Sequence, residues 1–191
     1  MDHSQTEKSY GAWRSPITAT LVASGLVNFS ELRDSEHGLL WVEQRPFDNG
    51  RSVLVLETRG ARRDLTPTPY SVRSRVHEYG GGAYCVAGDN VFFVNAIDQN
   101  IYWCSLLDGL TEITQLTAGN ENVRYADMTW DSRREHLVGV RETHDAGSEP
   151  VNQLVAIDCR TGAVNVVHSG HDFYSSPRLS SDAERLAFLV W

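Results

Sequence analysis

Short apolar segments alternate with polar turns along most of the chain. They are rich in β-branched and aromatic residues, and each is bounded by Gly, Asp, Asn or Ser. Most are too short for helices, and several are apolar at every position, which is typical of strands covered on both faces. The segments are 39–42, 53–56, 91–94, 101–103, 137–140, 154–157 and 186–191. The pattern therefore predicts an all-β protein.

The pattern repeats about every 49 residues. The first apolar segment of successive repeats begins at positions 39, 91, 137 and 186, at intervals of 52, 46 and 49 residues. A second and a third segment follow in each of the first three repeats, and from the second repeat on a less apolar segment precedes the first. Each repeat therefore holds four strands. Four-stranded units that stack face to face around an axis are the blades of a β-propeller.

The rival interpretation is a β-sandwich of irregular strands, but a sandwich has no reason to repeat at this period. We predict a partial β-propeller of about 3.5 blades over residues 26–191. Close approach at the crowded axis would favour the run Gly80-Gly81-Gly82-Ala83 in an innermost strand. The expected blades are 30–68, 69–118, 119–170 and an incomplete 171–191.

Residues 1–14 form a polar leader, and residues 15–25 are predicted to form a short helix. Ser15 suits its N-cap, Pro16 its first turn and Gly25 its end. Ile17 and Leu21, four residues apart, would give this helix one apolar face.

Composition narrows the class of protein. The 191 residues include 25 acidic and 17 basic ones, for a net charge of −8, which argues against nucleic acid or an anionic membrane as the main partner. The single lysine, Lys8, makes lysine-based chemistry an unlikely basis for function. Cys85, Cys104 and Cys159 form no C-x-x-C pair, and no secretion signal or membrane span is present. We expect a cytoplasmic protein without a cofactor.

Several stretches resemble known peptidases. The segment 176–188, SPRLSSDAERLAF, resembles the blade motif of TolB-type and prolyl-oligopeptidase-type propellers, with Ser181 in place of a proline and Ala183 in place of a glycine. The stretches 10–18, 76–84 and 169–177 resemble segments near the start of bacterial S9 serine peptidases of the dipeptidyl aminopeptidase and acylaminoacyl peptidase type. The resemblance extends from about residue 10 to the end.

In that family a propeller precedes an α/β-hydrolase domain that carries the catalytic Ser, Asp and His. The propeller covers the active site and restricts it to short peptides. Because this chain ends inside its fourth repeat and has no G-x-S-x-G motif, the resemblance implies a substrate-gating segment without catalytic residues, whose partner is a C-terminal hydrolase domain. The alternative is a TolB-like binding module that completes its ring by self-association. A truncated product without a function of its own is a third interpretation.

The segment 72–79 offers candidate substrate-binding groups. In an extended strand alternate side chains share a face, so a basic row at a channel mouth could hold a peptide carboxylate, while Glu78 could pair with a substrate amine. The alternative is a solvated loop or strand whose arginines pair with neighbouring blades. The candidates are Arg73, Arg75, His77 and Tyr79 on one face and Glu78 on the other.

His168 and His171 form an H-x-x-H pair beside Asp172. This spacing can bring two imidazoles to one metal ion, but no third ligand follows at a matching distance. We therefore expect a structural role for both histidines and no metal site, with Asp172 capping the turn.

Overall fold

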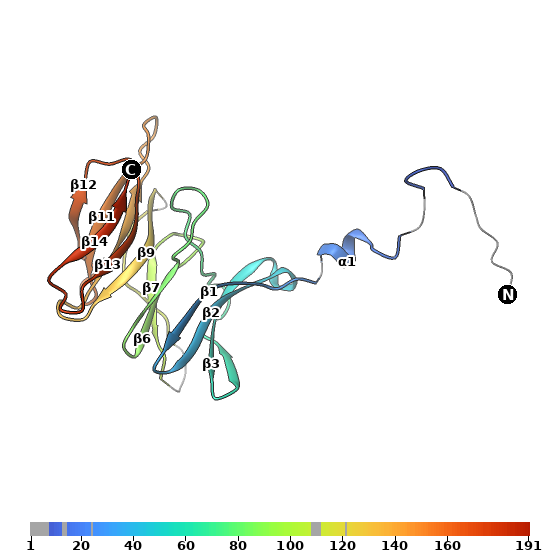
Figure 1. Cartoon of the computed structure of the whole chain (residues 1–191), viewed down its shortest axis with the longest axis horizontal. Coiled ribbons are helices and arrows are strands. Elements are labelled where there is room, and N and C mark those ends of the chain that lie inside the picture. Colours follow the sequence, from blue (N-terminus) through green and yellow to red (C-terminus); the bar gives the residue numbers. More distant parts are fainter. Residues whose placement is uncertain (1–7, 13–14, 24, 108–111, 121) are drawn as a thin grey trace.

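The chain folds into three four-stranded antiparallel sheets followed by a two-stranded one (Figure 1). The computed structural model describes residues 8–12, 15–23, 25–107, 112–120 and 122–191. The first sheet contains β1 (Asn28–Ser35), β2 (Gly38–Arg45), β3 (Arg51–Thr58) and β4 (Ala61–Asp64). The second contains β5 (Tyr84–Ala87), β6 (Asn90–Val94), β7 (Ile101–Ser105) and β8 (Thr114–Gln115).

The third sheet contains β9 (Val123–Asp131), β10 (His136–Thr143), β11 (Val151–Asp158) and β12 (Val164–Ser169), and the last pair is β13 (Tyr174–Leu179) and β14 (Leu186–Val190). Strands pair in sequence order within every sheet. The first strand of each sheet is innermost, since β9 contacts both β5 and β13. The predicted all-β partial propeller is confirmed.

Apolar side chains fill the spaces between successive sheets. Val91 and Phe93 of β6 pack toward the first sheet, in a cluster with Leu40 and Leu54. Phe92 and Val94 of the same strand pack toward the third sheet, in a second cluster. Alternate residues of a strand point to opposite faces, so a strand between two neighbouring sheets must be apolar at successive positions. This explains the continuous apolar runs in the sequence.

A left-handed backbone residue recurs in or just before each inner strand. Glu31, Gly82, Asp127 and Ser176 have φ angles of 55°, 58°, 53° and 55°. The Glu31 carboxylate accepts the N–H of Ala83 at 2.9 Å, and the Asp127 carboxylate accepts the N–H of Ser176 at 2.5 Å. Gly82 uses its backbone carbonyl, which accepts the N–H of Asp127 at 2.8 Å. Glu31, Gly82 and Asp127 therefore each accept a hydrogen bond from the next blade.

The glycine run 80–82 lies just before β5 and not inside a strand. Of its three glycines, Gly82 makes the close approach to the next inner strand: an added Cβ would lie 2.6 Å from Cα of Asp127. The crowding predicted near the axis is therefore present at this position.

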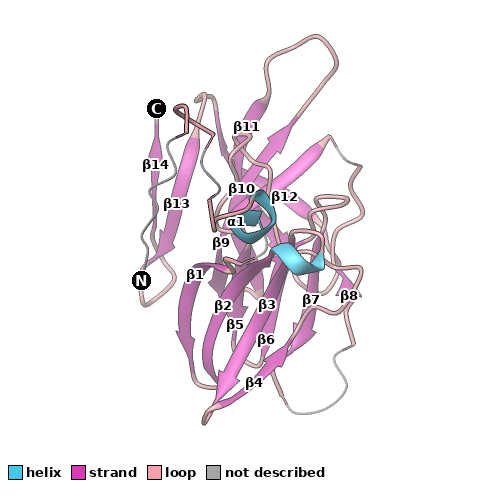
Figure 2. Cartoon of the chain, turned by 90° about the vertical axis from the view of Figure 1, so that its right-hand side faces the viewer, coloured by secondary structure: helices cyan, strands magenta, loops and turns pink. Residues whose placement is uncertain are grey.

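Helical structure is limited to α1 (Ala19–Ala23) and the 3-10 turn η1 (Pro46–Asp48) among the described residues (Figure 2). The prediction of a helix over 15–25 placed its start too early. Thr18 Oγ1 accepts the N–H of Leu21 at 3.0 Å and is the N-cap, whereas Ser15 Oγ accepts the N–H of Ile17 in a turn. Both residue types cap helices well, so local sequence does not choose between them.

Ser24 and residues 1–7 and 13–14 of the predicted leader lie outside the described residues. The side chains of Ile17 and Leu21 are exposed, and α1 lies away from the sheets (Figure 1). No helix in the described part of the chain has the length and apolar character needed to cross a membrane.

Candidate functional site

The segment 72–79 begins at a β-bridge and ends in a turn over residues 76–79. Val72 forms an isolated bridge with Asn95, after which His77 and Glu78 take left-handed φ angles of 56° and 66°. The turn is closed by hydrogen bonds from the N–H of Glu78 to the Arg75 carbonyl and from the N–H of Gly80 to the Val76 carbonyl, both at 3.0 Å. The predicted alternation of side chains therefore holds over residues 72–76, where 73 and 75 are exposed and 72, 74 and 76 are buried, and it fails from His77, where the backbone reverses.

The predicted basic row is limited to Arg73 and Arg75, because the backbone reverses at His77 and Glu78. Arg73 and Arg75 are both exposed. The Arg75 guanidinium donates to the Ala96 carbonyl at 2.7 Å, so it helps to hold the β6–β7 loop in place. Tyr79 is exposed as well, and its ring centroid lies 5.8 Å from that of His77.

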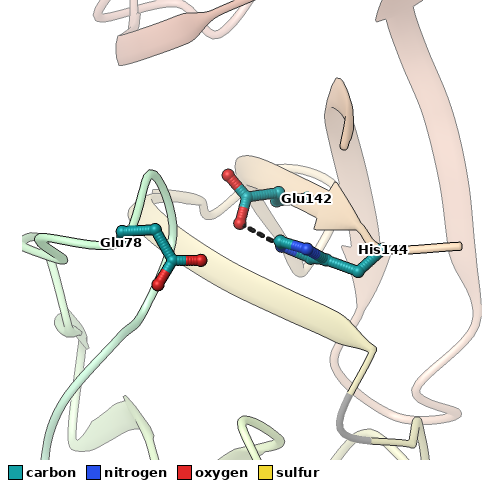
Figure 3. A group of neighbouring side chains, drawn as sticks. All are labelled: Glu78, Glu142 and His144. Atoms are coloured by element: carbon teal, nitrogen blue, oxygen red, sulfur yellow. Dashed lines mark hydrogen bonds and ion pairs between the residues drawn. The ribbon is translucent and has the colours of Figure 1, made fainter. Parts of the chain in front are cut away.

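The turn instead places Glu78 beside two residues of the third sheet. Glu142 near the end of β10 is 3% exposed, and His144 lies just after that strand, with its Nε2 2.6 Å from Glu142 Oε1 (Figure 3). Potential ligand atoms of Glu78, Glu142 and His144 all lie within 4.8 Å of one another. Glu78 is one of the candidates expected from the sequence, whereas Glu142 and His144 are not.

Arg124 of β9 connects the two carboxylates. Its guanidinium donates to Glu78 Oε1 at 2.7 Å, to Glu142 Oε1 at 3.3 Å and to the Arg75 carbonyl at 2.9 Å. Glu142 Oε2 accepts the N–H of His77 at 2.8 Å. The hydrogen bond from Arg124 lowers the pKa of Glu78, and the charge of Arg124 acts in the same direction. Glu78 is therefore ionised at neutral pH.

Glu78, Glu142 and His144 line a cavity of about 490 Å³, the acidic cavity. Asn152 of β11, only 4% exposed, donates through Nδ2 to the Asp172 carbonyl at 2.8 Å. Its Oδ1 is buried and has no hydrogen-bond partner among the described residues. Buried polar atoms normally have partners, so Asn152 Oδ1 is an acceptor available to a ligand. The other lining residues include Glu149, Pro150 and Phe173.

The cavity is suited to a cation. Four acidic residues line it, Glu78, Glu142, Glu149 and Asp172, and Arg124 contacts only the first two. Glu78, Glu142 and His144 have the donor types of a metal site, but the Arg124 guanidinium already binds both carboxylates. An ammonium group can bind at the remaining acceptors without displacing it.

The histidine pair of the H-x-x-H motif makes structural contacts. His168 Nδ1 lies 2.9 Å from the Tyr174 hydroxyl, and the His168 and His171 rings stack at a centroid distance of 5.6 Å. In the described residues, neither belongs to a group of three or more potential metal ligands. The carbonyl of Asp172, next in the chain, accepts the Asn152 amide at the acidic cavity.

The fold of this chain resembles solved structures of peptidases. No family model and no curated protein matches the chain. A puromycin-hydrolysing peptidase from Mycobacterium tuberculosis matches with a TM-score of 0.84 and 30% identity over 98% of this chain. A puromycin hydrolase structure matches equally well by TM-score, at 28% identity over 98% of this chain. The predicted resemblance to the S9 peptidases is confirmed.

The resemblance covers the propeller part of these S9 peptidases, and the chain spans 31% of their length. A second puromycin hydrolase structure, a variant in complex with PGG, matches at 29% identity over 96% of this chain. An oligogalacturonate lyase from Vibrio parahaemolyticus shares the fold alone, with a TM-score of 0.51 and 17% identity over 74% of this chain and 39% of its own.

Proposed function

We propose that this chain is the substrate-gating propeller segment of an S9-type serine peptidase that acts on short peptides, and that the segment does not cleave bonds by itself. The observation that carries the proposal is the match of 98% of the chain to puromycin-hydrolysing peptidases. An α/β-hydrolase domain would supply the nucleophile, because the sequence contains no G-x-S-x-G motif.

The acidic cavity is proposed to hold the free amino group of the substrate. Puromycin carries such a group on its aminoacyl part. Arg124 binds Oε1 of Glu78, so the second oxygen of this exposed carboxylate can accept a hydrogen bond from a ligand ammonium. Asn152 Oδ1 supplies a second acceptor, and the Phe173 ring supplies an apolar wall. Charge-assisted hydrogen bonds of this kind are the stronger class.

Binding at the amino end gives the propeller its gating role. A substrate held by its ammonium group has a fixed orientation, which lowers the entropic cost of reaction at a catalytic group nearby. Substrates without a free amine lose the ion pair with Glu78. Because the pKa of Glu78 is lowered and an α-amino group titrates near pH ~8, binding should persist at mildly acidic pH and weaken above about pH 8.

Calorimetric titration of the purified chain with puromycin and N-acetylpuromycin tests the proposal. We expect puromycin to bind at least about tenfold more tightly, since hydrogen bonds to charged groups contribute about 1.5–3 kcal/mol. Glu78→Gln should remove this difference, whereas Glu36→Gln, at an exposed residue after β1, should leave it unchanged. The chain should neither hydrolyse puromycin nor react with a fluorophosphonate serine probe.

Two results would contradict the proposal. Equal affinity for both compounds would exclude recognition of the amine. Labelling of the chain by the serine probe, abolished by prior denaturation, would show a nucleophilic serine within it and exclude a purely gating role.

The alternative function, a TolB-like binding module that closes its ring by self-association, is favoured by one observation. Phe29 and Leu32 of the first sheet are 66% and 70% exposed, and they line a hollow of about 630 Å³ with Leu39 and Trp41. Apolar patches of this kind are typical of interfaces.

A further inference from the structure

A second cavity, the axial cavity, lies among the distal halves of the inner strands. It has a volume of about 460 Å³, and all four inner strands contribute to it. Along β9 it begins at Met128, whereas Arg124, which binds Glu78 and Glu142 of the acidic cavity, lies near the start of the same strand. At about 3.3 Å per residue, Arg124 and Met128 are roughly 13 Å apart along this strand. The main lining residues are Arg33, Asp34, Cys85, Met128, Trp130 and Arg178.

Arg33 is a partly buried cation whose charge acts on the nearby Glu31 carboxylate without a direct ion pair. Its guanidinium carbon lies 5.1 Å from the centroid of the Tyr84 ring. Its Nε is buried and has no hydrogen-bond partner, and no carboxylate of the described residues lies within ion-pair distance. The nearby Glu31 carboxylate accepts the N–H of Ala83. A buried donor left unpaired costs free energy, so Nε of Arg33 is available to an anionic ligand.

Arg178 of β13 supplies a second guanidinium to the same cavity. Its side chain is 61% exposed and lies 4.0 Å from Asp127 Oδ1, while the other oxygen of Asp127 accepts the N–H of Ser176. Its Nη1 also donates to the Pro177 carbonyl at 2.7 Å. These contacts leave part of the guanidinium fork unused, since arginine has five N–H donors.

Two carboxylates accompany the arginines of the axial cavity. Asp34 is the one acidic residue that lines the axial cavity among the described residues. Asp127 does not line it but lies 4.0 Å from Arg178. These carboxylates balance part of the charge of the two arginines, and the unpaired Nε of Arg33 is the donor that they leave for a ligand. Trp130 and Met128 give the cavity an apolar wall.

We propose that Arg33 and Arg178 bind the C-terminal carboxylate of a short peptide in the axial cavity. A guanidinium offers parallel N–H donors that match the two oxygens of a carboxylate. This site differs from the basic row expected at Arg73 and Arg75. The proposal rests on the proposed function only in taking the ligand to be a peptide.

An NMR titration of the full chain with N-acetyl-trialanine and with its C-terminal amide tests the site. The acetyl group removes the amine, so the acidic cavity is not engaged. We expect the free acid to bind at least about tenfold more tightly than the amide. Arg33→Gln and Arg178→Gln should each weaken binding of the free acid by about tenfold or more. Arg59→Gln, the same charge change at an exposed turn, should have no effect.

Equal affinities for acid and amide, absence of binding by the acid, or an equal loss in Arg59→Gln would overturn the proposal. Arg178 is exposed, so its variant tests the site even if Arg33→Gln impairs folding. Failure of puromycin binding with retained acid binding would contradict only the amine site. Retained puromycin binding without acid binding would contradict only the carboxylate site.

Discussion

Gly82 shows how a single residue determines the distance between two blades. Its carbonyl accepts the N–H of Asp127 at 2.8 Å, and the side of Gly82 where a Cβ would lie is filled by the backbone of Asp127. Gly88 has almost the same φ angle, 59° against 58°, but nothing lies within 4 Å of its Cβ position. Comparison of Gly82 with Gly88 therefore separates the effect of backbone strain from the effect of steric contact.

Alanine at these two glycines should have different effects. Gly88→Ala should lower the free energy of unfolding by about 1–2 kcal/mol, the cost of a left-handed conformation for a non-glycine residue. Gly82→Ala should cost about 1–3 kcal/mol more, because the added methyl group forces the two inner strands apart. Urea unfolding of both variants measures the difference. Equal losses would show that the contact with Asp127 relaxes freely.

At the scale of elements, aspartates hold the hairpin turns. Asp131 at the end of β9 is 3% exposed and accepts the N–H groups of Arg133 and Arg134 and, at 2.8 Å, the Arg134 guanidinium. Burial opposes ionisation of Asp131, but these hydrogen bonds outweigh it and hold its pKa below the usual value. Asp158 at the end of β11 accepts two backbone N–H groups in the same way.

Because the pKa of Asp131 is lowered in the folded state, the variant Asp131→Asn should lose stability in a pH-dependent way. A carboxylate whose pKa is lower in the folded state stabilises the fold above its unfolded pKa of about 3.9, and this contribution disappears as the pH falls through the folded pKa. At pH 7 the free energy of unfolding of the variant should be about 1–2 kcal/mol lower than that of the parent chain. This difference should become smaller toward pH 3.

Asp158→Asn is the matched control for Asp131→Asn, since both aspartates accept two backbone N–H groups at the end of a strand. Its side chain is more exposed than that of Asp131, so its substitution should cost less at pH 7. Urea titrations of both variants at pH 7 and pH 3 give the comparison. A loss in Asp131→Asn that is independent of pH would show that shape, and not charge, stabilises the turn.

At the scale of the whole molecule, the first sheet has one face that no other sheet of the described residues covers. Trp41, Val53 and Val55 form a small cluster there, and the Arg62 guanidinium carbon lies 5.3 Å from the centroid of the Trp41 ring. Phe29 and Leu32 remain mostly exposed. In the other sheets, apolar residues on the equivalent face pack against a neighbouring blade.

We therefore expect the purified chain to self-associate through this face as its concentration rises. Leu32→Lys combined with Phe29→Lys should lower the mass-average molecular weight at high concentration, because charges oppose burial of the patch. Phe47→Lys, at an equally exposed position in η1, should not. Light scattering over a concentration series measures this, and a monomer at all concentrations would contradict the expectation.

The blades could be predicted from sequence because burial on both faces imposes continuous apolar runs, and stacking repeats them. Glu78 could be proposed because its type suits an amine. Its partners could not, since Arg124 is 46 residues away in the chain and the turn that joins them depends on left-handed residues at 77 and 78. Glu142 and His144 are two residues apart, so an extended segment would place them on the same face. Nothing in that pattern connects them to residue 78.

Local patterning and short motifs are enough to predict the all-β class, the four-stranded period and the resemblance to S9 peptidases. Which polar groups meet depends on how the blades stack. Stacking of the blades brings Glu78 to Arg124 and Glu142, and brings Arg33 and Arg178 to one cavity. The physical reason is that side-chain electrostatics depend on distance in space, and the distances between blades are determined by packing around the axis.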